Sequence, residues 1–282
     1  MRLAASVGVV GCLGLVLCGC PKDKDESLTS AEALDAADES AVSSQASSLT
    51  TSSVEISTSF TLGQGVQQAA NEIRTFIQTQ LPCADIQVAA GKLTVSYGAK
   101  PGTCTYKGHT FTGSHSIEVS KNVDNQVIVD HTWTNLSNGV VKVTGTAHVT
   151  WDFDDKFRNV KHDLTWTRIR DGRTGHGTGD RTQRPLANGL KEGIETDGTW
   201  SWVGKGGKWD LVVDNVEWRW QDPVPQAGSY KLSTPKSKSL TLSFARVDED
   251  TIKVTVSNGK NSFSFNVNKI GGAASTNGGA EG

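Results

Sequence analysis

The sequence predicts a mainly β fold, an antiparallel open barrel or two-layer sandwich of about 10–12 strands, with one N-terminal amphipathic helix. Two observations predict the strands. Apolar and polar residues alternate in many short runs after Cys83, and turn signals containing Gly or Asn separate those runs. A third observation predicts the helix, because a single stretch before Cys83 repeats its apolar residues at helical spacing.

The predicted helix covers residues 61–81. Its apolar residues fall on one stripe: Leu62, Val66, Ile73, Ile77 and Leu81. Thr61 and Gln64 have the spacing of a capping box, and Pro82 ends the helix. The polar face lacks a basic band, which favours packing on the domain's own sheet over lying on a membrane surface.

The predicted strands follow this helix. The clearest alternating runs are residues 143–151, 240–244, 252–256 and 263–267, and each is typical of a half-buried antiparallel strand. The glycine-rich stretch 172–181 breaks the pattern. No helical period follows it, as a phosphate-binding loop would require, so we expect an extended loop or hairpin there.

The N-terminus has the composition of an export signal. Arg2 precedes an apolar run over residues 3–17 that is too short to span a bilayer. The run ends in Leu17-Cys18-Gly19-Cys20, which resembles the lipobox of bacterial lipoproteins. The resemblance implies that residues 1–19 are a lipoprotein signal peptide and that Cys20 becomes the lipid-modified first residue. It places the protein in the cell envelope, and Pro21 favours the outer membrane, on its periplasmic side or its surface.

The rest of the chain divides by composition into three parts. Residues 20–57 are rich in Ser, Thr, Ala, Asp and Glu and show no sustained period, which predicts a lipid-anchored disordered tether. Residues 58–270 are expected to form a single β domain, and the small polar residues 271–282 a disordered tail. Deleting residues 26–55 should then barely change the melting temperature.

Charge and motifs exclude several function classes. From residue 58 onward the chain has 25 basic and 22 acidic side chains, which is no nucleic-acid signature. The sequence contains no nucleophile elbow, cofactor motif or zinc-ligand spacing. We therefore expect no cofactor and no bound metal, and a binding protein more than an enzyme.

Two cysteines remain in the mature chain besides the lipidated one. In an oxidising envelope compartment, Cys83 and Cys104 are expected to form a disulfide that ties the end of the helix to the first hairpin. Closing a loop of about 20 residues stabilises a fold by roughly 3 kcal/mol on the chain-entropy model. A catalytic thiol or a zinc pair would need histidines clustered with them, which the sequence does not show.

Tryptophan is concentrated in one region, since all eight lie between residues 133 and 220. Most share a strand face with aliphatic residues and are expected in the core. Trp200 and Trp202 share their face with Thr196 and Gly198 instead, so this strand is the first candidate for a ligand groove. The flat apolar face and N–H donor of Trp suit sugar stacking or an amphipathic ligand.

His131 and His162 are further candidate ligand-binding residues. Each shares a strand face with Val and Trp residues, so both are expected to be partly buried on neighbouring strands. Such imidazoles bind ligands or move protons, and they also occur as hydrogen-bonded core residues. Glu192, Glu195 and Asp197 offer the carboxylates that a glycoside hydrolase would need.

Together these features predict an envelope-anchored, non-enzymatic β domain that binds a lipid or glycan ligand or a protein partner. The order of helix and strands is similar to that of lipoprotein carriers, which shelter acyl chains between a helix and a curved sheet. A polysaccharide-acting hydrolase and a purely structural or interaction protein remain alternatives. An apolar cavity would favour the carrier, whereas exposed Trp200 and Trp202 beside two carboxylates would favour the hydrolase.

Overall fold

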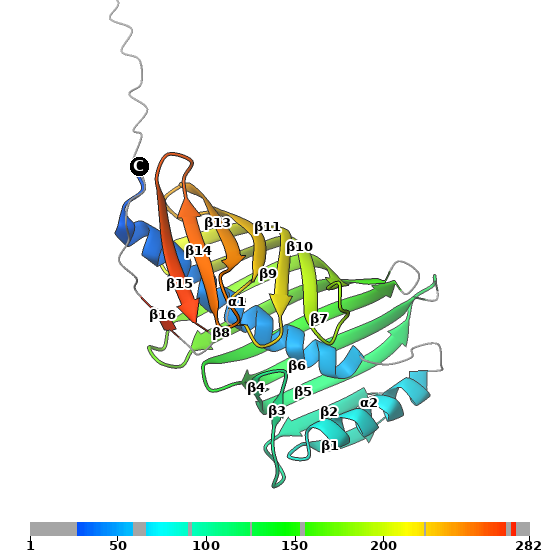
Figure 1. Ribbon diagram of the computed structural model, residues 1–282. Helices are drawn as coiled ribbons and strands as arrows, with labels where there is room; N and C mark the ends of the chain where they lie inside the picture. The colour runs from blue at the N-terminus through cyan, green and yellow to red at the C-terminus, as the bar shows by residue number, and fades with distance from the viewer. Residues whose placement is uncertain are drawn as a thin grey trace, which may run out of the picture.

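All but two of the described strands form one curved antiparallel sheet (Figure 1). A computed structural model describes residues 27–58, 66–89, 92–124, 126–152, 156–222, 224–268 and 272–274. The signal peptide, Cys20 and residues 275–282 of the expected tail lie outside the described residues. Within the described residues, neither helix has an apolar stretch sufficient to cross a lipid bilayer.

The sheet has 14 strands in meander order. They are β1 (Asp85–Ala89), β2 (Lys92–Tyr97), β5 (Thr112–Lys121), β6 (Val127–Ser137), β7 (Val141–Asp152), β8 (Phe157–Arg168), β9 (Thr174–Pro185), β10 (Gly193–Gly204), β11 (Gly207–Arg219), β12 (Ala227–Ser233), β13 (Ser239–Arg246), β14 (Thr251–Ser257), β15 (Ser262–Asn268) and β16 (Gly272–Ala274). In the sequence, a small separate hairpin of β3 (Thr105–Tyr106) and β4 (His109–Thr110) comes between β2 and β5, which pair directly in the sheet. The predicted mainly β, antiparallel class is confirmed. The sheet is open, because its ends β1 and β16 do not pair with each other.

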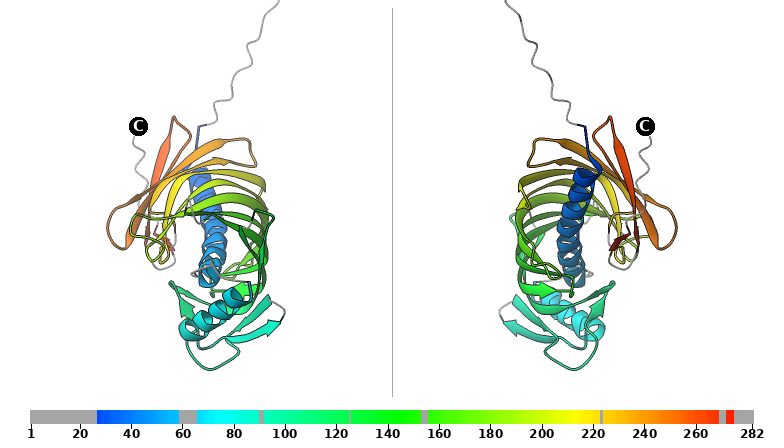
Figure 2. Two further views of the ribbon diagram at one scale, coloured as in Figure 1. Left: turned by 90° about the vertical axis from the view of Figure 1, so that its right-hand side faces the viewer. Right: turned by 90° about the vertical axis from the view of Figure 1, so that its left-hand side faces the viewer.

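A long helix, α1 (Ser30–Thr58), lies inside the curve of this sheet (Figure 2). The prediction of a disordered tether is therefore wrong for residues 30–57. Every residue from Val42 to Ile56 is buried or half-buried, so this part of the helix has no exposed face to alternate with a buried one. A helix enclosed on all sides carries no amphipathic period, which is why the sequence pattern did not reveal it.

The helix α1 fits this position because its side chains are small. Twelve of its 29 residues are Ser or Thr, and six more are Ala. The sheet supplies the bulk, since all eight tryptophans are buried. Small residues on the helix face large ones on the sheet, and this complementarity lets the helix pack close to the sheet.

The second helix, α2 (Val66–Gln80), confirms the predicted amphipathic helix over its described length. Ile73 and Ile77 are fully buried, whereas Arg74 and Gln78 are exposed. The helix packs on β1, β2 and β5 at one end of the sheet. Its stripe therefore covers the domain's own strands, as predicted. Residues 61–65 of the predicted helix lie outside the described residues.

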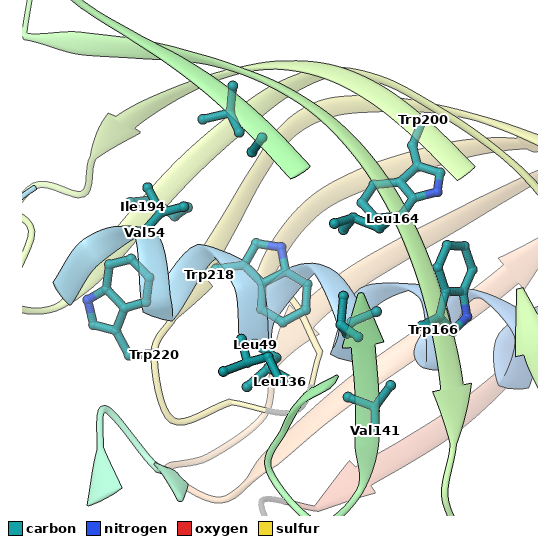
Figure 3. Packing of buried hydrophobic residues seen from close by; sticks show 14 of the residues in the cluster. Leu49, Val54, Leu136, Val141, Leu164, Trp166, Ile194, Trp200, Trp218 and Trp220 are labelled. Atoms are coloured by element: carbon teal, nitrogen blue, oxygen red, sulfur yellow. The ribbon is translucent and has the colours of Figure 1, made fainter. Parts of the chain in front are cut away.

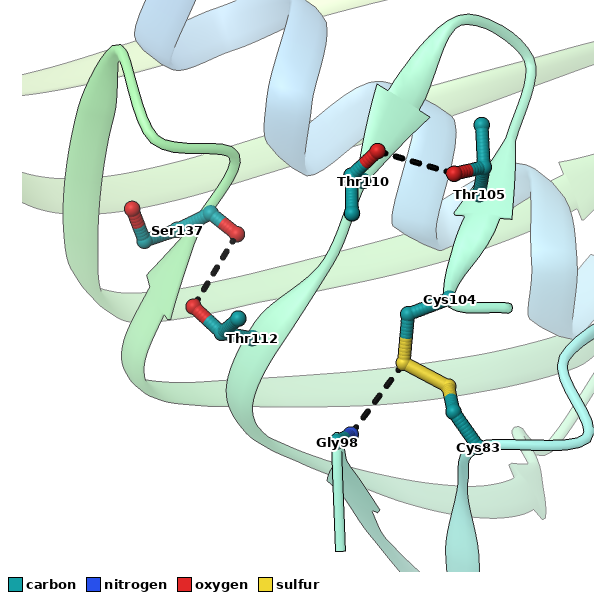
Figure 4. The surroundings of a disulfide bond; sticks show 7 residues. All are labelled: Cys83, Gly98, Cys104, Thr105, Thr110, Thr112 and Ser137. Carbon is teal, nitrogen blue, oxygen red and sulfur yellow. Dashed lines mark hydrogen bonds between the residues drawn. A yellow bond between two sulfur atoms is a disulfide. The ribbon is translucent and has the colours of Figure 1, made fainter. Parts of the chain in front are cut away.

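A disulfide joins Cys83 and Cys104 across 21 residues, with a Cα–Cα distance of 5.4 Å (Figure 4). The pairing agrees with the prediction. It links the turn after α2 to the segment before β3, and the backbone N–H of Gly98 donates to Cys104 Sγ at 3.1 Å. The bond thus ties the α2 end of the fold to the first hairpin.

The glycine-rich stretch is a central strand, β9, and the expected loop is wrong. Gly175, Gly177 and Gly179 lie on its inner side, where a Cβ would fall 2.4 to 2.5 Å from atoms of Trp166, Trp202 and His162 respectively. Large rings from the neighbouring strands β8 and β10 cross the strand at these glycines. The glycines are therefore needed for close packing of the rings, not for backbone mobility.

Candidate functional site

We call the face of the sheet that meets α1 the inner face, and the opposite face the outer face. Trp166, Trp200, Trp218 and Trp220 project from the inner face toward the helix, around Leu49 and other residues of α1 (Figure 3). Polar groups of α1 bond to this aromatic layer. Trp133 Nε1 donates to Ser53 Oγ at 2.8 Å, and Trp202 Nε1 donates to a Glu39 oxygen at 3.2 Å. The helix is thus hydrogen-bonded as well as packed.

The N-terminal half of α1 is held by carboxylates that meet arginines of the sheet. Asp38 accepts from Arg168 at 2.6 Å and from Arg173 at 2.8 Å, and buried Glu39 accepts from Arg173 at 3.2 Å. Burial opposes ionisation of Asp38, but the hydrogen bond and charge of Arg168 outweigh it and lower the Asp38 pKa below its ordinary value. These groups form a charged clamp on the inner face.

The C-terminal half of α1 contains one buried ion pair and many hydroxyls. Glu55 and Arg158 are both almost fully buried and lie 3.4 Å apart. Ser47 Oγ accepts from Arg181 Nη1 at 2.6 Å, and the Arg181 guanidinium stacks over the Trp200 ring at 4.3 Å. Burial lowers the Arg181 pKa to about 10.

The four candidate ligand-binding residues all lie on this inner face, beneath α1. Trp200 and Trp202 are each 1% exposed, so the predicted stacking surface is closed to solvent. His162 packs on Trp200 with ring centroids 4.2 Å apart. His131 belongs to a separate group at the β5–β6 pair. The candidates therefore do not form one open groove.

The group around His131 is a short buried chain of polar rings. His115 Nε2 and His131 Nδ1 are 2.9 Å apart, and the Tyr97 hydroxyl is 3.3 Å from His115 Nδ1. Both imidazoles stack with Trp133. Burial lowers the His115 pKa to about 3 and, with the charges of His115 and Arg158, holds the His131 pKa well below its ordinary value. These histidines are neutral core residues at neutral pH.

An open hollow lies on the outer face. It is a hollow of about 550 Å³ across β6 to β10, which we call the outer hollow. Two cross-strand rows of side chains line it: Thr132, Thr146, Asp163, Thr178 and Ser201 in one row, and Asp130, His148, Lys161, Asp180 and Thr199 in the other. The row between them, His131, Ala147, His162 and Gly179, also lines the hollow, so two of the candidate ligand-binding residues border it. Sequence alternation placed His148 outward with threonines, but only the strand register brought these rows together.

Carboxylates in the outer hollow orient its basic groups. His148 Nδ1 lies 2.7 Å from Asp130, and Lys161 Nζ lies 3.6 Å from Asp180. Asp163 of the hollow forms a similar pair, at 2.8 Å, with His176, which does not line the hollow. The threonine hydroxyls between these pairs are exposed. The hollow therefore offers hydroxyl, carboxylate, imidazole and ammonium groups, and no Trp, Tyr or Phe is among its described lining residues.

Two of the three carboxylates suggested for glycoside hydrolysis serve other contacts. Glu192 lies 4.0 Å from Arg219, and Asp197 lies 3.6 Å from Arg184 and accepts from the backbone N–H of Asn215. None of the three, Glu195 included, lines the outer hollow. Among the described residues, no group of three or more His, Cys, Asp or Glu side chains is placed to hold a metal ion.

Comparison of the chain with protein-family models, with curated proteins and with solved structures found no match. The site must therefore be interpreted from its own geometry.

Proposed function

We propose that this chain is a lipid-anchored, non-enzymatic binding domain of the bacterial cell envelope, and that the outer hollow is its ligand site. The observation that carries the proposal is the hollow itself. Its volume of about 550 Å³ falls within the usual range of ligand sites, roughly 300–1,000 Å³. Its polar groups are fixed on rigid central strands rather than on loops, and such groups hold a ligand in one orientation.

The lining favours a polyhydroxylated ligand, such as an envelope glycan. Exposed Thr146 and Thr178 offer hydroxyls that both donate and accept hydrogen bonds. The hydroxyl of half-buried Ser201 donates to Asp210, so toward a ligand it acts as an acceptor. Asp163 accepts from ligand hydroxyls, and Lys161 donates to them. Neighbouring strands lie about 4.8 Å apart, so the row presents polar groups at regular intervals to a chain molecule laid across the strands.

Two other interpretations lack the feature each required. An acyl-chain carrier needs an apolar cavity, but α1 fills the inner face, and the two cavities beside it measure about 10 and 20 Å³. A sugar hydrolase was expected to expose Trp200 and Trp202, which are buried. A glycan-binding role for the outer hollow needs neither feature.

The anchor places this domain close to the membrane. Only six residues separate Cys20 from the first described residue, Ser27, and this length of chain reaches at most about 25 Å. The 37-residue tether expected from composition would have spanned roughly 30–37 Å as a flexible coil. Because α1 is part of the fold, the proposed lipoprotein works near the membrane surface.

Binding is tested with isolated peptidoglycan sacculi in a sedimentation assay. We expect the wild-type protein to sediment with sacculi and Thr178→Arg, which fills the outer hollow, to remain in the supernatant. Ser233→Arg is the matched control, because Ser233 is exposed on β12 and outside the lining of the hollow. Equal sedimentation of both variants would show that any binding is elsewhere, and no sedimentation of the wild type would exclude this glycan.

Anchoring is tested separately by Cys20→Ala. We expect the variant to lose acylation in mass spectra and to leave the membrane fraction. Acylation that persists at another cysteine would refute the assignment of Cys20.

A further inference from the structure

One buried arginine under α1 lacks the carboxylate partner that its neighbours have. Arg158 pairs with Glu55, and Arg168 and Arg173 pair with Asp38. Arg181 lies on the same inner face and is 7% exposed, but no described carboxylate lies within ion-pair distance of it. A buried charge without a counter-charge is strongly unfavourable, so this position needs compensation.

The groups around Arg181 compensate its charge only in part. Ser47 Oγ accepts one hydrogen bond at 2.6 Å and the Trp200 ring lies below the guanidinium. Arg181 Nε is buried and has no hydrogen-bond partner among the described residues. The acidic group that most affects Arg181 is the phenol of Tyr230, whose pKa burial raises. That phenol is neutral at pH 7 and carries no counter-charge.

Two small cavities, of about 10 and 20 Å³, lie beside Arg181 between α1 and the sheet. Ser47, Thr51 and Gln183 line both of them with Arg181. The larger cavity is also lined by a second arginine, Arg219, and the smaller by His162, while no carboxylate lines either. Apart from apolar residues such as Val54, Ile194 and Trp218, the described lining is therefore cationic or hydrogen-bonding and contains no acidic side chain.

We propose that one small inorganic anion, of the size and charge of chloride, binds in the larger cavity beside Arg181. Arg181 supplies the positive charge and its unpartnered Nε–H. The Ser47 hydroxyl accepts from Arg181, so its own hydrogen is available as a donor. Gln183 Oε1 accepts from Arg158 at 2.7 Å, which leaves the amide N–H₂ of Gln183 as a third donor.

The size of the cavity selects a monoatomic anion. A cavity of about 10–15 Å³ by this measure holds one water-sized particle, so 20 Å³ accommodates a halide and not a phosphate or a carboxylate. The anion would neutralise the buried guanidinium where α1 supplies only hydroxyls. Anion binding and docking of the helix are then linked, because Ser47 belongs to α1 and Arg181 to β9.

The test measures thermal unfolding of the full-length protein in non-ionic detergent. Sodium gluconate is replaced by sodium chloride at constant ionic strength. We expect the Tm to rise by about 3–5 °C and then to saturate, as for a single ligand site on the folded state. Arg181→Gln should abolish this chloride dependence. Arg184→Gln is the matched control, because Arg184 lies on the same strand, is exposed and pairs with Asp197, and it should keep the dependence.

A milder variant and a direct measurement cover the case in which Arg181→Gln fails to fold. Ser47→Ala keeps the charge and removes one donor, so it should weaken the apparent chloride affinity about 2–10-fold. Crystals of the wild type soaked in bromide should show an anomalous peak between Arg181 and Ser47. A chloride-independent Tm of the wild type, or a bromide soak with no anomalous peak at Arg181, would overturn the proposal.

Discussion

The two helices pack on the same sheet by opposite means. The helix α2 buries one apolar stripe, including Ile73 and Ile77, and leaves its other side in solvent. The helix α1 is enclosed from Val42 to Ile56 and buries hydroxyls and carboxylates as well as aliphatic side chains. Apolar burial and the neighbouring disulfide are the main contacts that hold α2, whereas α1 also depends on polar partners from the sheet.

The largest expected effect is that of removing α1. Deleting residues 27–58 exposes the inner face and loses the burial of Val42, Leu49, Val54 and Ile56. At about 1.5–3 kcal/mol for each buried side chain, the loss exceeds 6 kcal/mol, and we expect the Tm to fall by more than about 15 °C. Circular dichroism melting measures it. Adding a synthetic peptide of residues 27–58 should restore part of the lost stability. If the deletion variant kept the wild-type Tm, residues 27–58 would be a tether and not part of the fold.

The next effect is that of breaking the buried ion pair of α1. Glu55→Ala leaves Arg158 buried without its carboxylate, so we expect the free energy of unfolding to fall by about 3–5 kcal/mol. Urea denaturation measures it. Glu118→Ala, at an exposed position on β5, should change the stability by less than about 0.5 kcal/mol. If Glu55→Ala were as stable as Glu118→Ala, the ion pair between Glu55 and Arg158 would not contribute to holding α1 on the sheet.

The corresponding change in α2 removes apolar contacts only. Ile77→Ala should cost about 2–4 kcal/mol, from lost burial and the cavity left behind. Because no charge is involved, the same difference from the wild type should be measured at pH 7 and pH 5. The neighbouring exposed position is the control, and Gln78→Ala should have little effect. A strongly pH-dependent cost at Ile77 would mean that the two helices are not held by different forces.

The smallest effect concerns acid pH at the start of α1. The hydrogen bond from Lys238 lowers the pKa of Glu32 from 4.5 to about 2. A carboxyl with a lowered folded-state pKa stabilises the fold above pH 4.5 and loses that contribution as the pH falls toward 2. Glu32→Gln should therefore lower the free energy of unfolding at pH 7 by less than about 1 kcal/mol, because the pair is partly exposed. The resulting small decrease in Tm should disappear at pH 2. An equal decrease in Tm at pH 7 and pH 2 would contradict the lowered pKa of Glu32 and its pairing with Lys238.

Local sequence patterns predicted the elements that have two different sides. Short-range periodicity predicted the α2 stripe and the alternating strands. The pairing of Cys83 with Cys104 was predicted from the oxidising compartment that the export signal implies. Alternation along β8 also places Arg158 and Arg168 on the same side as Trp166, which indicates that these two arginines face the core. Inward-facing arginines of this kind call for acidic partners, and the carboxylates of residues 32–55 were the available ones.

Short-range periodicity and composition were enough to predict the antiparallel β class, the amphipathic helix, the cysteine pair and the burial of most tryptophans. Long-range packing makes the Ser- and Thr-rich segment a helix, makes the glycine-rich segment a strand, and covers Trp200 and Trp202. These features escaped local patterns because α1 has no apolar stripe of its own. Its polar side chains become stable in the interior only when arginines and tryptophans from distant strands meet them there.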